Sequence, residues 1–257
     1  MVLIKHIGQY VLETLTTLGR LVNFFAKAIA HCFKPPYFYQ LILKQVMDIG
    51  YYSLPVVGLT TLFSGMVLAL QSYNGFTRFS SESAVATVVA LSITRELGPV
   101  LAGLMVTGRV GSSIAAELGS MKVSDQIDAL KILGTNPFDY LIAPRIIACI
   151  ICLPILVLIG DIIGIFGGFL VGVYKLNFNP STYLYQTVSY LEPMDIASGL
   201  IKASIFGLLL GMMGCFHGYN CNRGAKGVGL ATTNAVVSGC ILILIFNYLV
   251  TELFFSS

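Results

Sequence analysis

Charged residues are scarce in this sequence of 257 residues: they make up 11% of it, whereas 56% of the residues are apolar. Soluble domains usually carry about a quarter charged residues, so the composition excludes an ordinary water-soluble globular protein. The net charge is only +3 and the basic residues are dispersed, which argues against nucleic-acid binding. Composition therefore predicts an integral membrane protein.

Motifs of an autonomous enzyme are also missing. The sequence contains no H-E-x-x-H, no G-x-S-x-G and no Walker A motif, and the GAKGVG run at 224–229 lacks the spacing of a phosphate loop. Cys149 and Cys152 form a C-x-x-C inside an apolar run, which favours buried free thiols over metal ligands. Cys215 and Cys221 could pair, although their spacing does not require it. We expect no catalytic residue, no metal and no cofactor.

Five apolar segments are long enough to cross a hydrocarbon core about 30 Å thick, which takes roughly 20 helical residues. They are residues 54–70, 84–107, 142–174, 196–216 and 229–255. The third is longer than a span needs, which predicts either a tilted helix or a surface turn near Pro144. Lysine and arginine gather in the loops after the second and fourth spans, so the positive-inside rule places these loops and the N-terminus in the cytoplasm and the C-terminus outside.

Residues 1–50 precede the bundle and begin with an amphipathic pattern. Polar residues recur at spacings of three and four and form one stripe: Gln9, Glu13, Thr16, Arg20, Asn23, Lys27 and His31. Apolar residues such as Ile7, Val11, Leu18 and Val22 face elsewhere. This pattern is typical of a helix lying in the membrane interface, and it also fits an amphipathic helix packed on protein. The Lys34-Pro35-Pro36 sequence is expected to end the helix.

Four charged residues lie within the spans: Arg95, Glu96, Asp161 and Lys202. A charge at membrane depth is costly unless it is paired or faces a polar cavity. Neighbours on a helix point about 100° apart, so at least one of Arg95 and Glu96 needs a partner on another helix. One interpretation is an ion pair of Lys202 with Asp161 or Glu96 that fixes helix register. The other is that Glu96 and Arg95 line a polar part of a substrate cavity, just before a bend at Pro99.

Glycines recur at four-residue spacing in the third and fourth spans, at Gly160, Gly164 and Gly168 and at Gly207 and Gly211. Small residues at this spacing let membrane helices approach closely. We interpret them as packing surfaces or bending points and not as a ligand site.

The loop after the second span contains a short predicted helix that ends near Leu133. Ser124 is a reasonable N-cap, Gly134 suits the position after the last turn, and Pro137 blocks continuation. Its apolar face comprises Val123, Ile127 and Leu130, and its rim comprises Asp125, Asp128 and Lys131. A helix of about three turns is marginal alone in water and needs a docking surface, either on a soluble partner or on the loops of this chain.

The run ELGPVLAGLMVTGRVGSSIAAELGSMKVSDQIDALKILGTNPFDYLIAPRIIA, residues 96–148, closely resembles the signature region of the MlaE/YrbE permease family. GYNCNRGAKGVGLATTNAVV, residues 218–237, is similar to the stretch before that family's last span. These proteins are the membrane subunits of lipid-transporting ABC systems that work with MCE-domain proteins. The sequence departs from the family pattern at Ser120, where threonine is common, at Asn234, where a basic residue often stands, and at Arg95, where the family varies.

The resemblance implies a single permease domain over residues 1–257, an all-α integral membrane protein with an interfacial N-terminal helix and five spans. It implies a homodimer in the bacterial inner membrane that moves phospholipids to a periplasmic MCE-domain partner and so maintains outer-membrane lipid asymmetry. ATP hydrolysis would occur on a separate ATPase subunit, and a small STAS-domain regulatory subunit is a further candidate partner. Residues 117–133 would include the coupling helix, with Glu117, Val123, Asp125, Ile127, Asp128 and Leu130 facing the ATPase. Glu96, with Arg95, would face a lipid cavity walled by the first and fifth spans.

Two other functions remain open at this point. A secondary carrier would use Glu96, Asp161 and Lys202 as a proton or ion relay, although the sequence has no internal repeat of the kind common in such carriers. A structural scaffold would anchor a peripheral complex without transporting anything.

Overall fold

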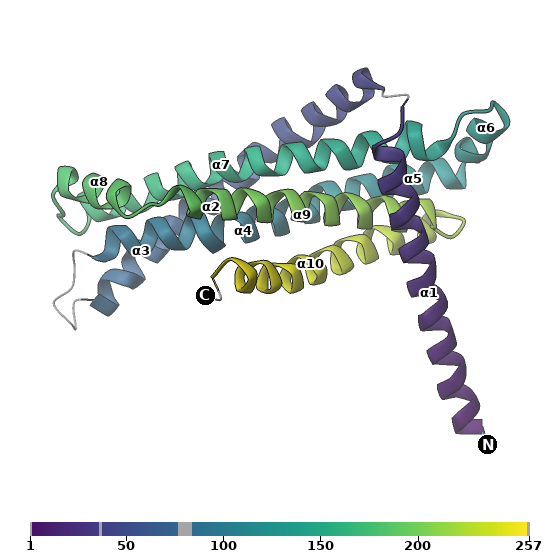
Figure 1. Ribbon diagram of the computed structural model, residues 1–257, viewed down its shortest axis with the longest axis horizontal. Helices are drawn as coiled ribbons and strands as arrows, with labels where there is room; N and C mark the ends of the chain where they lie inside the picture. Colours follow the sequence, from purple (N-terminus) through teal and green to yellow (C-terminus); the bar gives the residue numbers. More distant parts are fainter. Residues whose placement is uncertain (1, 36–37, 77–83, 256–257) are drawn as a thin grey trace.

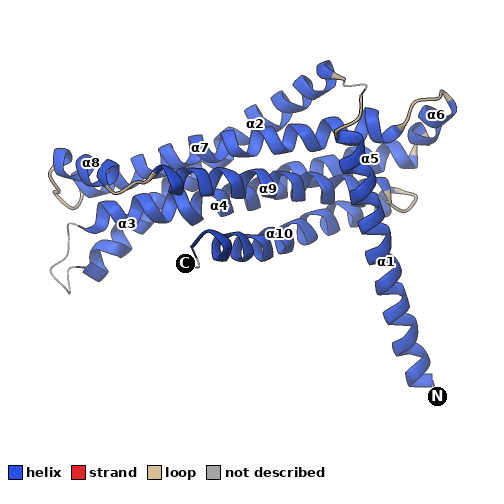
Figure 2. Ribbon diagram, in the orientation of Figure 1, coloured by secondary structure: helices blue, strands red, loops and turns tan. Residues whose placement is uncertain are grey.

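The computed structural model describes residues 2–35, 38–76 and 84–255, without the side chains of residues 2–11, 13, 14 and 255. Within this part of the chain every regular element is helical, as Figure 2 shows. The elements are α1 (Val2–Cys32), α2 (Tyr39–Phe76), α3 (Ala84–Ser92), η2 (Ile93–Leu97), α4 (Gly98–Val106), η3 (Thr107–Gly111), α5 (Ser112–Val123), α6 (Gln126–Ile132), η4 (Phe138–Ile142), α7 (Ala143–Tyr174), α8 (Pro180–Ser189), α9 (Pro193–Tyr219) and α10 (Ala225–Phe255). The predicted all-α class is confirmed.

Five helices of the described chain are long and apolar enough to cross a membrane, as predicted. They run over Tyr39–Phe76, Ala84–Val123, Phe138–Tyr174, Pro193–Tyr219 and Ala225–Phe254, so most extend well beyond the predicted apolar segments. The second continues past Thr107 to Val123 because the π-helical turn η3 carries the helix onward. The third has no surface turn near Pro144. Pro144 instead lies in the first turn of α7, directly after η4, where its missing N–H group costs no hydrogen bond of an α-helix.

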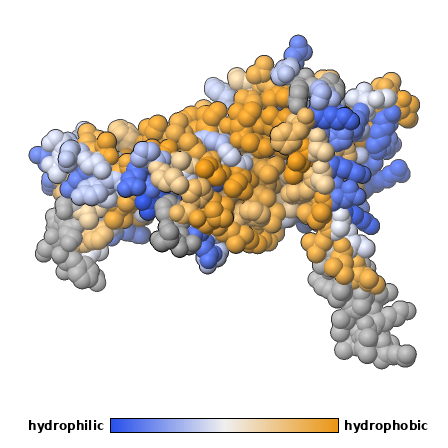
Figure 3. All heavy atoms as spheres, in the orientation of Figure 1, coloured by the Kyte–Doolittle hydropathy of each residue, from blue (hydrophilic) through white to orange (hydrophobic). Residues whose placement is uncertain are grey.

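The spans run roughly along one axis and pack into a bundle (Figure 1). One end carries α6 and the C-terminal part of α1, and the opposite end carries α8 and the start of α3. Apolar residues cover most of the middle of the face seen in Figure 3, and polar residues gather toward both ends. This distribution fits a protein whose middle lies in hydrocarbon and whose ends meet water.

Helix α1 leaves the bundle steeply at the end that carries α6 (Figure 1). Phe24 anchors it, with ring centroids 5.4 Å from Phe138, 5.5 Å from Phe216 and 6.0 Å from Tyr219. The apolar residues Leu15, Leu18 and Val22 stay exposed. This exposed apolar face favours the membrane interface over packing on protein. The side chains of Ile7, Gln9, Val11 and Glu13, and the whole of Pro36, lie outside the described part of the chain.

Backbone-on-backbone contacts hold the spans together. A Cβ atom on Gly65 of α2 would lie 1.9 Å from the carbonyl oxygen of Gly164 in α7. A Cβ atom on Gly207 of α9 would lie 2.5 Å from the carbonyl oxygen of Cys149, also in α7. The interpretation of the glycine series as packing surfaces is therefore confirmed, and α7 is the central helix of the bundle.

The short helix α8 was not predicted. It lies between the third and fourth spans, and the Asn179 side chain caps it by accepting a hydrogen bond from the backbone N–H of Ser181. Its Tyr183 side chain is buried against the bundle. Ten residues are too few to produce the apolar run by which spans are recognised.

Candidate functional site

The charged residues of the spans meet where a π-helical turn interrupts the second span. The turn η2 contains both Arg95 and Glu96, and its closing bond runs from the N–H of Gly98 to the carbonyl of Ile93. Such turns are rare and shift the facing of the residues that they contain. Pro99, the second residue of α4, lacks an N–H group, so the carbonyl of Arg95 loses its normal α-helical donor.

Lys202 of α9 supplies the missing donor. Its Nζ atom donates to the Arg95 carbonyl oxygen at 2.8 Å and to Glu96 Oε1 at 2.5 Å. The Lys202 side chain is 0% exposed, so its ammonium group has exchanged water for these two acceptors. Of the two sequence alternatives for the partner of Lys202, the structure selects Glu96 and not Asp161.

The Glu96 carboxylate connects the second span to α9 and α10 by hydrogen bonds. Thr251 of α10 donates to Oε1 at 2.8 Å, and Asn247 of α10 donates to Oε2 at 2.9 Å. Sequence reasoning missed both residues, although a polar pair four residues apart in an apolar span is a signal that could have found them. The Glu96 side chain is still 37% exposed, so it is a paired carboxylate at an accessible surface.

Arg95 points to a different partner. Its Nε atom donates to Asp195 Oδ1 at 2.7 Å, and the other carboxylate oxygen of Asp195 accepts from the backbone N–H of Glu192 in a capping box at the start of α9. Both Arg95 and Glu96 therefore pair across helices. Glu96 lies about 18 Å along the helix that starts at Ala84, so the group lies toward the end of the bundle that carries α8.

Asp161 stands apart from this group. It is buried in α7, and its Oδ1 atom has no hydrogen-bond partner among the described residues. That oxygen instead lies against Gly98, where an added Cβ atom would come within 1.8 Å of it. An isolated, ionised carboxylate would be very costly at this position.

The predicted helix beyond the second span differs from the expectation. Ser124 does not cap its start: the hydroxyl donates back to the Ser120 carbonyl at 2.8 Å, and Ser124 ends α5. Asp125 turns the chain with a φ of 56°, and α6 then has only seven residues. Gly134, with a φ of 78°, ends it as predicted.

The apolar face predicted for this helix is divided between the protein interior and the surface. Ile127 is 0% exposed and packs into the core of the bundle, and Leu130 packs beside it. Ile132 and Leu133, which were not selected from the sequence, are 87% and 78% exposed. Ile127 therefore anchors α6 to this chain, whereas Ile132 and Leu133 form the apolar surface available to a partner.

The predicted polar residues of the segment also have partners within the chain. Hydrogen bonds from Lys131 at 2.8 Å and Lys122 at 3.2 Å hold the pKa of the Asp128 carboxyl below its ordinary value. Glu117 accepts from Arg145 of α7 at 2.7 Å, which ties α5 to the start of the third span. Val123 is half-buried and Asp125 is exposed.

The six cysteines are free thiols in the structure, including Cys215 and Cys221. Among the described residues there is no cluster of histidine, cysteine and carboxylate side chains that could hold a metal ion.

Comparison with known proteins identifies the family. The family model "Permease MlaE" matches residues 42–253. A "Probable ABC transporter permease protein" of Rickettsia bellii is 59% identical over 98% of this chain and 97% of its own length. The "Intermembrane phospholipid transport system permease protein MlaE" of Haemophilus influenzae is 34% identical over 99% of this chain and 98% of its own length. "Protein TRIGALACTOSYLDIACYLGLYCEROL 1, chloroplastic" of Arabidopsis thaliana is 40% identical over 83% of this chain and 61% of its own length.

These similarities extend over the interhelical charge group and the segment that contains α6. This multi-pass membrane protein belongs to the MlaE permease family.

Proposed function

We propose that this chain is the permease subunit of an ABC transporter that moves phospholipids between the inner membrane and a periplasmic MCE-domain partner, and so maintains outer-membrane lipid asymmetry. The observation that carries the proposal is the similarity, over nearly the full length of both chains, to the intermembrane phospholipid transport permease of Haemophilus influenzae. The active unit is a homodimer, and the energy comes from a separate ATPase subunit. A small STAS-domain protein is a further candidate partner.

Glu96 and Arg95 are the proposed polar contacts of the lipid cavity. The Glu96 carboxylate is held by Lys202, Asn247 and Thr251, yet about a third of its side chain is accessible. The Oδ1 atom of Asn247 is buried without a hydrogen-bond partner among the described residues, so the Glu96 carboxylate is the accessible acceptor for an incoming hydrogen-bond donor. A lipid headgroup or glycerol hydroxyl has suitable chemistry.

The ATPase is proposed to bind the segment 117–133 and the adjoining α6 end of the bundle. Glu117, Val123, Asp125, Ile127, Asp128 and Leu130 belong to this segment, and its exposed apolar contacts are Ile132 and Leu133. The second span continues from Ala84 to Val123 through the π-helical turns η2 and η3, so a displacement at Val123 can be transmitted to Glu96, about 40 Å away, along one continuous helix. The loops at this end carry the basic residues, which supports a cytoplasmic N-terminus and a periplasmic C-terminus.

A charged double substitution at the exposed positions tests the coupling surface. Ile132→Asp with Leu133→Asp is expected to abolish copurification with the ATPase while leaving the fold intact, because neither side chain is packed. Ile127→Asp is the contrasting variant, because it introduces a charge into the core and is expected to destabilise the permease itself. Normal ATPase binding and stimulation by the double variant would refute the assignment.

An ion-coupled secondary carrier is the second candidate, and the observation that favours it is the buried Oδ1 atom of Asp161, which has no hydrogen-bond partner among the described residues. In the described part of the chain no hydrogen bond joins Asp161 to Glu96 or Lys202, so a relay needs a rearrangement. Phospholipid movement driven by an imposed proton gradient, without nucleotide or ATPase and lost in Asp161→Asn, would support the carrier.

A further inference from the structure

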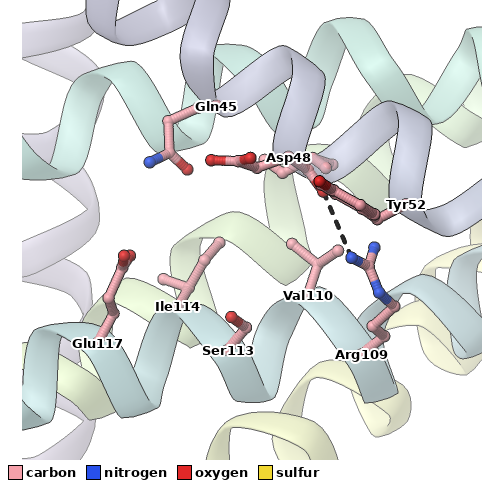
Figure 4. Close-up of a pocket in the computed structure, with 9 residues that line it drawn as sticks. Gln45, Asp48, Tyr52, Arg109, Val110, Ser113, Ile114 and Glu117 are labelled. Atoms are coloured by element: carbon pink, nitrogen blue, oxygen red, sulfur yellow. Dashed lines mark hydrogen bonds between the residues drawn. The ribbon is translucent and has the colours of Figure 1, made fainter.

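A polar cleft lies between α2 and α5, near the end of the bundle that carries α6 (Figure 4). Its volume is about 290 Å³, and it has no part in the charge group around Glu96. Gln45, Asp48 and Tyr52 line it from α2, and Arg109, Ser113 and Glu117 line it from the second span. In Figure 4 the carboxylates of Asp48 and Glu117 both point into the gap between the two helices.

The one cationic side chain of the cleft is held firmly at one end. Arg109 donates from Nη1 to the hydroxyl of Ser53 at 2.6 Å and from Nη2 to the carbonyl oxygen of Asp48 at 3.5 Å. Its guanidinium carbon also lies 5.7 Å from the centroid of the Tyr52 ring, which is a cation–π distance. A guanidinium group has five N–H donors, so Arg109 retains donors for an anionic ligand.

The opposite end of the cleft is acidic. Glu117 is neutralised by Arg145 at 2.7 Å, but the Asp48 carboxylate forms no hydrogen bond or ion pair with the described residues. The cleft thus presents a cation at one end and an uncompensated carboxylate at the other. A free anion would be repelled by Asp48, and a metal cation by Arg109, whereas a zwitterion satisfies both ends.

An apolar stripe on α2 begins at the cleft. Tyr52, Val56, Leu59 and Phe63 are all exposed, and their spacing of three and four places them on one helix face. Phe63 lines a second, more apolar groove of about 430 Å³ that also includes Leu97, the neighbour of Glu96. A molecule with a zwitterionic head and long apolar chains matches this succession of surfaces.

We propose that the cleft between α2 and α5 is a headgroup site for a zwitterionic phospholipid bearing a primary ammonium group. The phosphate binds Arg109, the ammonium binds Asp48, and the acyl chains lie along the α2 stripe toward the groove beside Leu97. This inference rests on the proposed function for its lipid ligand and for its placement in the cytoplasmic leaflet. It adds to that function a loading site about 20 Å along the second span from Glu96.

The absence of tryptophan from the sequence permits a sharp test. Tyr52→Trp introduces a single tryptophan at the cleft, which can be excited selectively, and keeps an aromatic ring over Arg109. The full-length variant is reconstituted in bilayers of brominated phosphatidylethanolamine with plain phosphatidylglycerol, and in the reverse mixture. Brominated phosphatidylethanolamine is expected to quench more strongly, with an apparent preference of about two- to fivefold, the range expected for exposed ion pairs.

Matched variants separate the site from the general lipid surface. Asp48→Asn in the Tyr52→Trp background is expected to remove the preference, and Arg109→Gln to weaken quenching by both lipids. Phe166→Trp, on the exposed face of α7, is expected to be quenched equally by both lipids with or without the Asp48 change. Should Tyr52→Trp fail to fold, Val56→Trp on the same stripe replaces it.

Two outcomes would overturn the proposal. Equal quenching by the two headgroups at Tyr52→Trp would mean that the cleft does not select lipid. No quenching by either would mean that protein covers the α2 face, as in an interface between copies. The quenching assay needs no nucleotide and no partner. Equal quenching by both headgroups together with intact ATP-driven lipid transfer would refute this inference alone. Selective quenching without ATP-driven lipid transfer would refute the proposed function.

Discussion

Replacing Lys202 with methionine is expected to destabilise the protein, and replacing Glu96 with glutamine in the same chain is expected to restore part of the loss. Lys202→Met removes the Nζ donor of the Arg95 carbonyl, whose α-helical donor position is occupied by Pro99, at a cost of about 1–3 kcal/mol. It also removes the ion pair with Glu96, which contributes about 1 kcal/mol because that carboxylate is partly exposed. The expected loss is about 2–4 kcal/mol.

Glu96→Gln alone leaves the Lys202 ammonium fully buried opposite a neutral amide. The expected cost is close to the lower end of the roughly 3–5 kcal/mol associated with breaking a buried pair, because the amide oxygen still accepts a hydrogen bond. In the double variant no charge remains uncompensated. We therefore expect a coupling energy of at least about 1 kcal/mol between the two positions.

Equilibrium unfolding in mixed detergent micelles, followed by far-ultraviolet circular dichroism, measures these four stabilities. Lys226→Met is the control, because Lys226 is exposed and its replacement is expected to change stability by less than about 0.5 kcal/mol. Additive effects of the two substitutions, or a loss below about 1 kcal/mol in Lys202→Met, would refute the account of this charge group.

Two further predictions concern packing and pH. Gly65→Ala is expected to separate α2 from α7 and to destabilise the protein by several kcal/mol, because the new Cβ atom would lie 1.9 Å from the Gly164 carbonyl oxygen. Gly229→Ala is the control: its Cβ atom meets open space, and the substitution is expected to stabilise the protein by about 0.5–1 kcal/mol. Thermal unfolding of the two variants measures both effects. Hydrogen bonds from Lys131 and Lys122 lower the pKa of the Asp128 carboxyl in the folded protein. Ionised Asp128 therefore stabilises α6 at pH values above the pKa that this carboxyl has in the unfolded chain, and the stabilisation is lost as the pH falls. Protection of α6 amides from hydrogen exchange should persist from pH 7 to about 5, fall below about pH 4, and lose this dependence in Asp128→Asn.

The membrane fold was predictable because apolar runs of sufficient length have few alternatives in water. The positions at which the helices end could not be predicted from the sequence. The second span continues past Thr107 into a polar stretch because η3 keeps the backbone hydrogen-bonded, and no composition signal marks a π-helical turn. Helix α8 was missed because its stability comes from Tyr183 packing on the bundle, which local sequence does not encode.

The charged site was predictable only in part. Glu96 and Lys202 stand out because a charge at membrane depth demands a partner. Which partner it takes depends on helix packing, and a freed carbonyl next to Pro99 positions Lys202 beside Glu96 and not beside Asp161. Asn247 escaped notice because an uncharged amide produces a weaker signal than a carboxylate.

The α6 segment shows how a local motif can mislead. A serine before an apolar run resembles an N-cap, but Ser124 bonds backward to the helix that it ends. The apolar periodicity correctly found Ile127, yet periodicity cannot distinguish a side chain that packs on its own protein from one that awaits a partner. The exposure of Ile132 and Leu133 became evident only from the three-dimensional structure.

ATP-dependent transfer of labelled phospholipid tests the central claim most directly. The permease and its ATPase are reconstituted in vesicles, and labelled lipid appearing on an added MCE-domain acceptor is measured with ATP, with a non-hydrolysable analogue and with an ion gradient alone. The account predicts transfer, in whichever direction, that requires ATP hydrolysis and is lost when Ile132→Asp and Leu133→Asp uncouple the ATPase. Transfer that proceeds with the ion gradient alone, or equally without any nucleotide, would contradict it.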